Sequence, residues 1–420
     1  MISRILALNY RCLRFVDRPL DGLHILVGPN GSGKSAFLDV VAVLARLVAD
    51  GLDAALEERG SDLRDLIWRG GGRRLELALE LRIPEERRSR LGDHPFPLFR
   101  YQVAIGVDGD SGEPVIEAET GLLRRQPEEP ELQQGRLFPE VTEAPETILL
   151  SGHALGTRTV FSKVPGGNDN FYREASADGG RSWAPVFRLG PRRSALANLP
   201  ADESSFPVAT WVRDLLSRGV RRLSLDGRRL RAPSPPGQGH DLQADGGNLP
   251  WVVHRLEERH PEGFLAWLDR VRVIEPGIET VSTVEQAADR HRHLTIGLRG
   301  GGEIPSWNAS EGTLRLLALT LLPHLPDLGG TWLIEEPETG LDPGAAVGML
   351  RSLTQVEGTQ LLVATHSPAI LGAADARSLL CFSKTEGGET RIVPGSEHPA
   401  LSAWKSEIDR EALLARGILG

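Results

Sequence analysis

A glycine-rich stretch near the start of the chain has the spacing of a phosphate-binding loop. Residues 28–35 read GPNGSGKS, which fits the pattern GxxxxGK[ST]. The glycines let the backbone fold into a nest of N–H groups around phosphate oxygens. Lys34 can then reach the β- and γ-phosphates, and the Ser35 hydroxyl can ligate Mg²⁺. The residues expected to bind ATP here are Asn30, Gly31, Ser32, Gly33, Lys34 and Ser35.

Two adjacent acids follow the apolar run 331–334. At the carboxyl end of a strand beside the phosphate loop, Glu335 can hold Mg²⁺ through water, and Glu336 can polarise the attacking water. Taken alone, the pattern also fits a solvated acidic turn. Together with the loop at 28–35 it favours ATP hydrolysis.

Two further positions fit the same chemistry. Ser310 and Gly312 begin an apolar helix, where the helix dipole and free amides favour an anion. Ser310 also fits an N-cap, and the two roles are compatible. His366 follows the strand 360–364 and is well placed to sense a γ-phosphate, although a lone histidine is more often structural.

The elements that position these residues alternate at both ends of the chain. An apolar strand at 23–27 precedes the loop and an apolar helix at 34–48 follows it, which is the context that the motif requires. The C-terminal part alternates helices at 311–325 and 343–355 with strands at 331–334, 360–364 and 378–382. Such alternation predicts a parallel sheet covered by helices.

The middle of the chain has a mixed pattern. Period-two alternation predicts antiparallel strands at 75–83 and 100–107, and 158–188 is also β-like. Residues 108–147 are expected to be loops and short hairpins, and 226–241 an exposed linker. The remaining predictions are strands at 2–8 and 292–298 and helices at 207–218, 250–259 and 262–270.

We therefore expect an α/β fold of the P-loop NTPase type with an inserted second lobe. Residues 1–107 and 291–420 would form the two halves of the ATPase head. The insertion would be 108–290, β-like over 108–190 and helical over 191–290.

Composition limits the class of protein. The 420 residues carry a net charge of −9, which argues against a chain that coats nucleic acid everywhere but leaves room for a local basic groove. The two cysteines, Cys12 and Cys381, belong to no metal-binding pattern and fit a reducing compartment. With neither a signal peptide nor a membrane-spanning run in the sequence, we expect a cytoplasmic protein.

The motifs, in their order, resemble those of the ABC-type ATPase superfamily. That order is Walker A at 28–35, signature at 310–315, Walker B at 333–336, D-loop at 340–343 and H-loop at 365–367. Within the superfamily, HILVGPNGSGKS, SEGTLRLLAL, LIEEPETGLDP and VATHSP are most similar to the RecF/SMC-like and overcoming-lysogenization-defect-like ATPases, often labelled AAA-family proteins. The signature SEG, rather than the SGG of transporters, fits this branch. The stretch after His366 is too short for the C-terminal nuclease domain of overcoming-lysogenization-defect-like proteins.

The resemblance implies a head-to-tail dimer with two ATPs between the subunits. Ser310 and Gly312 of one subunit would face the ATP of the other, and Asp342 would lie at the dimer seam. Glu336 would be the catalytic base, His366 the γ-phosphate switch, and Glu335 the Mg²⁺-holding acid in place of the more frequent Asp. Gln102 is a candidate for the Q-loop glutamine or an ordinary strand residue.

Three functions remain open on the sequence. The first is a sensor ATPase that acts with a separate nuclease or toxin in anti-phage defence. The second is a RecF-like DNA repair ATPase, and the third is a scaffold that binds ATP without turnover, against which the presence of Glu336 and His366 speaks. A DNA surface would use one arginine-rich segment, which contains Arg213, Arg218, Arg221, Arg222, Arg228, Arg229 and Arg231, although a solvated basic segment fits as well.

Overall fold

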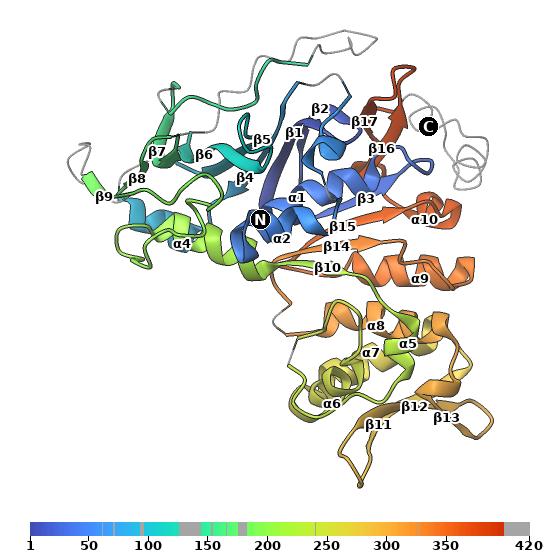
Figure 1. The fold of residues 1–420 in the computed structure, drawn as a ribbon. Helices are drawn as coiled ribbons and strands as arrows, with labels where there is room; N and C mark the ends of the chain where they lie inside the picture. Colours follow the sequence, from blue (N-terminus) through green and yellow to red (C-terminus); the bar gives the residue numbers. More distant parts are fainter. Residues whose placement is uncertain are drawn as a thin grey trace. The chain divides into compact units, whose positions relative to one another are not determined.

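The chain forms two compact units, each assembled from separate segments of the sequence (Figure 1). The computed structural model describes residues 1–60, 62–69, 72–92, 96–125, 144–152, 154–164, 166–174, 183–239, 241–326 and 328–398. The first unit consists of Met1–Asp21, Ser32–Val220 and Ser383–Ile392. The second unit consists of Gly22–Gly31, Arg221–Phe382 and the described residues from Val393 onward.

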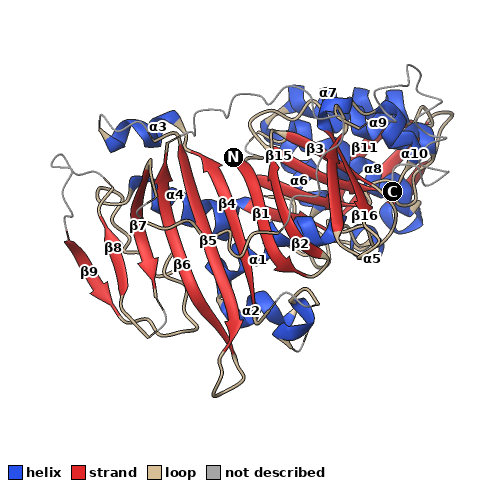
Figure 2. Cartoon of the chain, turned by 90° about the horizontal axis from the view of Figure 1, so that it is seen from above, coloured by secondary structure: helices blue, strands red, loops and turns tan. Residues whose placement is uncertain are grey.

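An eight-stranded antiparallel sheet forms the centre of the first unit (Figure 2). Its strand order is β2-β1-β4-β5-β6-β7-β8-β9. The strands are β1 Ile2–Tyr10, β2 Leu13–Pro19, β4 Arg74–Arg82, β5 Leu98–Val107, β6 Pro114–Arg124, β7 Thr157–Lys163, β8 Asp169–Tyr172 and β9 Trp183–Phe187. The helices of this unit are α1 Lys34–Asp50, α2 Leu52–Glu57, α3 Glu85–Arg88 and α4 Pro207–Asp214.

The central strands of this sheet are buried on both faces. On β4, Leu77 and Leu79 alternate with polar residues, and α1 packs against β1 and β4. Polar residues of these strands are buried too, and some of them form hydrogen bonds with the backbone of Ile148. The Ile148 N–H donates to Glu76 (2.8 Å), and Arg100 donates to the Ile148 carbonyl (2.6 Å). Burial of these charges is therefore compensated by hydrogen bonds.

The second unit contributes most strands of a mainly parallel sheet with the strand order β10-β14-β15-β3-β16-β17, although most of β17 belongs to the first unit. The strands are β3 Leu23–Val27, β10 Val220–Leu223, β14 Thr331–Glu335, β15 Gln360–Thr365, β16 Leu379–Lys384 and β17 Thr390–Pro394. The helices are α5 Gly227–Arg231, α6 Leu249–Arg259, α7 Pro261–Ile274, α8 Glu311–Leu321, α9 Pro343–Leu353 and α10 Pro368–Ala373. A three-stranded antiparallel sheet contains β11 Ile278–Glu285, β12 Arg292–Leu298 and β13 Glu303–Pro305.

Helix α8 lies at the centre of the core of this unit. Its apolar residues are buried almost all around, and it packs against both α7 and α9. The polar atoms in this interface are paired, since the Trp267 indole N–H donates to the Thr320 hydroxyl (3.1 Å) and that hydroxyl donates to the Leu316 carbonyl (2.7 Å). A helix this apolar is stable only inside a core.

The structure confirms the α/β class and the strand–helix alternation of the C-terminal part, and it corrects two expectations. The expected loops at 108–147 contain the 11-residue strand β6. The alternation of apolar and polar residues typical of a strand is not visible in its sequence, because the charged residue Glu119 occupies a buried position. The expected linker at 226–241 contains helix α5, which Asp226 caps and the fully buried Leu230 anchors. Residues 126–143 of the first stretch lie outside the described residues.

The division between the units also differs from the expected insertion at 108–290. The boundary falls between Val220 and Arg221. The β-like part of the expected insertion extends the sheet of the first unit, because β6 pairs with β5. The helical part belongs to the second unit. In the described ranges, no helix has both the length and the hydropathy needed to cross a membrane.

Candidate functional site

The loop after β3 has the backbone of a phosphate-binding nest. Gly28, Gly31 and Gly33 have φ values of 148°, 75° and 109°, which residues with a side chain rarely adopt. A Cβ on Gly28 would lie 2.2 Å from the Phe382 carbonyl oxygen, and one on Gly33 would lie 2.2 Å from the Thr390 hydroxyl oxygen. Both positions therefore require glycine on steric grounds as well.

Helix α1 begins directly after this loop, at Lys34, with Gly33 as its N-cap. Glycine has no side chain, so the N-cap residue itself makes no side-chain capping bond to the first turn. Ser32 is buried, and its hydroxyl oxygen has no hydrogen-bond partner among the described residues. The positive φ angles of the loop and the start of a helix directly after it are the features expected of an anion-binding loop.

Three strand ends meet at one edge of the sheet in the second unit. Glu335 pairs with Ala364 in the register of β14 and β15, and Thr365 pairs with Val27 in the register of β15 and β3. The three strands are parallel and therefore end at the same level. Glu335, His366 and Gly28 consequently follow neighbouring strand ends, as the sequence predicts for a nucleotide site of this class.

Glu336 adopts an unusual backbone conformation for a residue with a side chain. Its φ is 47°, and its N–H donates to the Ala364 carbonyl (2.8 Å). Its carboxylate is more than half exposed, and Glu336 Oε1 lies 3.5 Å from His366 Nδ1. A left-handed conformation of this kind is uncommon and is often found at functional sites. The two residues predicted to act on the γ-phosphate side are therefore neighbours.

Glu338 is a residue that the sequence prediction missed. Its Oε1 accepts a hydrogen bond from the Thr365 hydroxyl (2.6 Å) and another from the His366 backbone N–H (3.2 Å). It thereby ties the turn after β14 to the turn after β15. The signal was present in the sequence as a third acid directly after the Walker B pair, in the run EEPE.

The Walker B acid Glu335 forms an ion pair with an arginine. Arg222 Nη2 lies 2.7 Å from Glu335 Oε1, and the exposed fractions of the two side chains are 53% and 25%. Arg222 comes from β10, the strand next to β14 in the sheet. In the sequence, this arginine stands out only as one member of a basic segment that could contact DNA.

The signature serine caps α8, as its local sequence predicts. The Ser310 hydroxyl accepts a hydrogen bond from the Thr313 N–H (3.0 Å). A Cβ on Gly312 would lie 2.0 Å from the Gly340 carbonyl oxygen, so the start of α8 packs directly against the turn before α9. Asp342 caps α9 by accepting from the N–H groups of Gly344 and Ala345. These three residues thus have structural roles within the subunit.

Gln102 is an ordinary strand residue rather than a phosphate ligand. It is buried in β5, and its amide oxygen accepts from Arg100 Nε (2.9 Å) and from the Leu150 N–H (3.0 Å). Its amide nitrogen donates to the Leu150 carbonyl (2.8 Å). The structure therefore favours an ordinary strand residue, rather than a Q-loop glutamine, at this position.

Most of the arginines between 213 and 231 already have partners within their own unit. Arg221 pairs with Asp241 and Arg229 with Asp245. Arg213 and Arg231 donate to backbone carbonyls, and Arg222 pairs with Glu335. Phosphate contacts along DNA would have to compete with these existing partners.

In the described residues, no group of three or more potential metal ligands occurs. His293 packs against the Trp307 ring with centroids 4.7 Å apart, and burial lowers the pKa of its imidazole.

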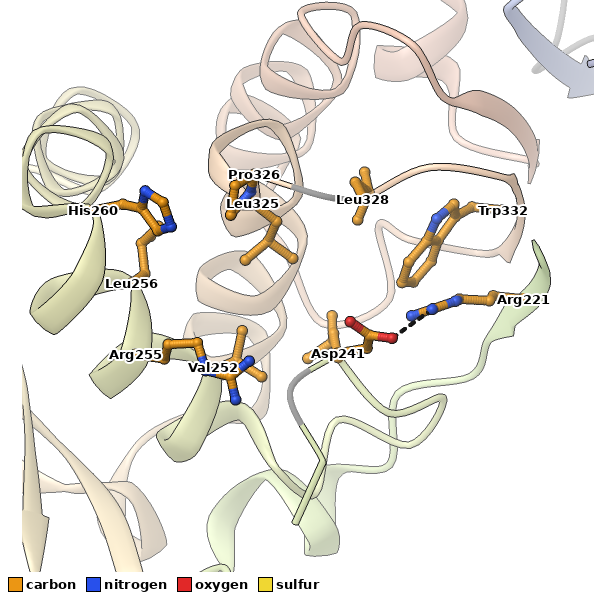
Figure 3. Close-up of a pocket in the computed structure, with 11 residues that line it drawn as sticks. Arg221, Asp241, Val252, Arg255, Leu256, His260, Leu325, Pro326, Leu328 and Trp332 are labelled. Atoms are coloured by element: carbon orange, nitrogen blue, oxygen red, sulfur yellow. Dashed lines mark hydrogen bonds and ion pairs between the residues drawn. The ribbon is translucent and has the colours of Figure 1, made fainter. Parts of the chain in front are cut away.

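A cavity of about 70 Å³ lies elsewhere in the second unit. Figure 3 shows Arg221 directed toward Asp241 at its wall, beside the Trp332 ring. None of the described residues that line it is among those expected to bind ATP. They are Arg221, Asp241, Leu242, Val252, Arg255, Leu256, His260, Leu325, Pro326, Leu328 and Trp332.

Comparisons with known proteins agree with this geometry. Residues 23–372 match the family model described as "AAA domain, putative AbiEii toxin, Type IV TA system". No curated protein matches the chain. Two solved structures with low sequence identity are similar in fold.

The first is the crystal structure of the SmcHead bound to the C-winged helix domain of ScpA. It is 12% identical, with a TM-score of 0.52, over 93% of this chain and 97% of that chain. The second is the Smc head domain with an extended coiled coil bound to the C-terminal domain of ScpA, derived from Pyrococcus furiosus. It is 11% identical, with a TM-score of 0.50, over 93% of this chain and 95% of that chain.

These similarities confirm the predicted P-loop NTPase fold, of the kind found in SMC heads. The family model covers most of the chain and includes the phosphate loop, the Walker B acids and His366. The chain therefore belongs to the AAA-domain family that carries the AbiEii description.

Proposed function

We propose that this protein is a Mg²⁺-dependent ATPase of the ABC and RecF-like type that dimerises around ATP and acts as a switch. The observation that carries the proposal is the common level of three strand ends, which brings Gly28, Glu335 and His366 to one edge of the sheet. This is the arrangement that cleavage of a γ-phosphate needs: a phosphate loop, a metal-holding acid and a base at one edge.

The phosphate loop would bind the ATP. Its backbone amides and the start of α1 would surround the phosphates, and Lys34 would neutralise the β- and γ-phosphates. The Ser35 hydroxyl and the Glu335 carboxylate are hard oxygen donors of the type that Mg²⁺ prefers, and the metal would supply charge neutralisation at the phosphates. The positive φ values of the loop glycines support this assignment.

Glu336 and His366 would carry the hydrolytic step. The exposed carboxylate of Glu336 would orient a water molecule and accept its proton as the water attacks the γ-phosphate. His366 would contact the γ-phosphate from the adjacent strand end. The 3.5 Å between Glu336 Oε1 and His366 Nδ1 supports a shared task for the two side chains.

The second subunit would complete the site through Ser310 and Gly312 at the start of α8, with Asp342 at the seam. The close packing of Gly312 on Gly340 supports a coupled movement of the two turns. ATP would then join two subunits, and hydrolysis would release them.

We further propose that the switch acts in the cytoplasm with a separate nuclease or toxin, in anti-phage defence. The toxin–antitoxin wording of the family description supports this reading. The relation to overcoming-lysogenization-defect-like ATPases belongs to the same proposal. A RecF-like role on DNA is the alternative, and the internal pairing of most arginines at 213–231 weighs against it.

The test is a pair of substitutions in the full chain. Glu336→Gln is expected to bind ATP, to lower turnover by about 100-fold or more, and to accumulate an ATP-bound dimer, because the base is lost while the phosphate contacts remain. Lys34→Ala is expected to lose ATP binding. Size-exclusion chromatography with light scattering gives the dimer, and phosphate release gives the turnover.

Two outcomes would contradict the proposal. One is turnover by Glu336→Gln at the wild-type rate, and the other is a dimer that is indifferent to ATP in both variants. The same assay with duplex DNA at low and moderate salt separates the alternatives. Salt-sensitive stimulation would favour the DNA role, and turnover indifferent to DNA would favour a protein partner.

A further inference from the structure

The two arginines of β10 point to different partners. Arg221 lies over the Trp332 ring at 5.4 Å and pairs with Asp241, as Figure 3 shows. Arg222, the next residue of the strand, is directed instead to Glu335. This follows from the alternation of side chains along a strand. The edge strand β10 thus places the Arg222 guanidinium beside Glu335, the acid that is proposed to hold the metal.

The acids at the end of β14 need positive charge nearby. Glu335, Glu336 and Glu338 lie within four residues of one another. Arg222 lies beside Glu335, and the His366 imidazole lies 3.5 Å from Glu336 Oε1 and 3.9 Å from Glu338 Oε1. An imidazole is only partly charged near neutral pH, whereas a guanidinium is always charged. Arg222 is therefore a permanently charged counter-ion at this turn.

We propose that Arg222 takes the place of Mg²⁺ at Glu335 while no nucleotide is bound, and that Mg²⁺ has to displace its guanidinium. The inference rests on the proposed function, since it assumes that Glu335 receives the metal. Arg222 is thus a positioning residue. It holds the Glu335 carboxylate in place and sets the Mg²⁺ concentration at which the site loads.

The strength of the ion pair suits such an exchange. A half-exposed arginine–carboxylate pair contributes at most about 1 kcal/mol, so a divalent ion that arrives with ATP can displace it. A fully buried pair would resist exchange. The exposed fraction of Arg222, 53%, also gives the displaced side chain access to solvent.

The experiment is a Mg²⁺ titration of mant-ATP binding by the full chain. Arg222→Ala is expected to reach half-maximal binding at roughly two- to fivefold lower Mg²⁺ than the wild type, because the competing cation is gone. Arg222→Lys, which keeps the charge, is expected to need a Mg²⁺ concentration close to that of the wild type. Arg229→Ala is the matched control, since it removes another exposed arginine, paired with Asp245 and not with the Walker B acid. An unchanged or higher Mg²⁺ requirement in Arg222→Ala overturns the inference.

A second measurement without nucleotide separates this inference from the proposed function. Millimolar Mg²⁺ is expected to raise the unfolding temperature of Arg222→Ala more than that of the wild type, and addition of Glu335→Gln to the variant is expected to abolish the difference. If the wild type bound no mant-ATP, the proposed function would fail, and the thermal measurement would still decide on Arg222. An equal response of wild type and Arg222→Ala to Mg²⁺ overturns the exchange.

Discussion

Glu338 holds two groups of the turn after β15 with a single oxygen. Its Oε1 accepts from the Thr365 hydroxyl and from the His366 N–H, while its Oε2 is buried with no partner among the described residues. The position of His366 therefore depends on a carboxylate that does not itself contact the side chain of the histidine closely. The distance from His366 Nδ1 to Glu338 Oε1 is 3.9 Å.

Glu338→Ala is expected to leave ATP binding intact and to lower turnover by about tenfold. The substitution removes both hydrogen bonds to Glu338 Oε1, so the free energy of unfolding should also fall by about 1–3 kcal/mol. Glu338→Gln is the matched variant, because its amide oxygen can accept the same two bonds, and it should recover most of the turnover. Phosphate release and thermal unfolding measure the two effects. If Glu338→Ala turned over ATP at the wild-type rate, Glu338 would not be needed to position His366.

At the scale of elements, the start of α8 and the turn before α9 act as one packed unit. Gly312→Ala is expected to push these two elements apart, because its Cβ would lie 2.0 Å from the Gly340 carbonyl oxygen. We expect a loss of about 1–3 kcal/mol in the free energy of unfolding. We also expect loss of the ATP-driven dimer with ATP binding retained, measured by light scattering and mant-ATP fluorescence.

Gly277→Ala is the control for this substitution. The nearest atom to its Cβ would be Glu275 Oε1 at 3.6 Å, an ordinary contact. Its stability and its dimerisation should match those of the wild type. A Gly312→Ala protein that dimerised normally would show that the signature helix does not have to lie against Gly340.

A buried acid that lies outside helix α4 in the sequence caps the N-terminus of this helix. Glu174 accepts from the N–H groups of Val208 and Ala209 (2.6 and 2.7 Å) at the start of this helix. Burial raises the pKa of Glu174 to about 7. Since this value lies above that of the unfolded chain, the folded protein binds the extra proton between about pH 4.5 and 7, and stability falls as the pH rises through this window.

The free energy of unfolding of the wild type is therefore expected to fall between pH 5 and pH 8, by about 2 kcal/mol from this residue. Glu174→Gln, which cannot ionise, should lose this part of the pH dependence. Urea unfolding at the two pH values measures the difference between the slopes. Equal slopes in the two proteins would mean that Glu174 does not titrate in this range.

The sequence predicted those elements that have strong local patterns. The strand before the phosphate loop, the helix α1 and the strands β14, β15 and β16 are apolar runs with clear ends, and they occur where expected. Strand β6 and helix α5 depend on distant partners instead. Glu119 on β6 is buried and accepts hydrogen bonds from Ser194 and from the backbone at 195–196. No local pattern in the sequence indicates these distant partners.

The same limit applied to the candidate site. The Walker A and B residues are adjacent in sequence to strand ends, so their convergence followed from the parallel sheet. Arg222 is separated from its partner Glu335 by 113 positions in the sequence, and Glu338 is separated from its partner Thr365 by 27 positions. A single sequence carries no signal for such pairings, which arise from the strand order.

At the scale of the whole molecule, the chain enters each unit more than once. It passes from the second unit to the first within the phosphate loop, between Gly31 and Ser32. The first unit also needs the distant segment Ser383–Ile392. There the Thr390 hydroxyl donates to the Ser32 carbonyl (2.9 Å), and Glu389 pairs with Arg14 (2.5 Å).

This arrangement has a consequence for synthesis on the ribosome. The strands that begin the first unit emerge early, but the side chain that fixes the phosphate loop belongs to a segment made more than 300 residues later. We therefore expect the phosphate loop to reach its final form only after the segment around Thr390 has been synthesised.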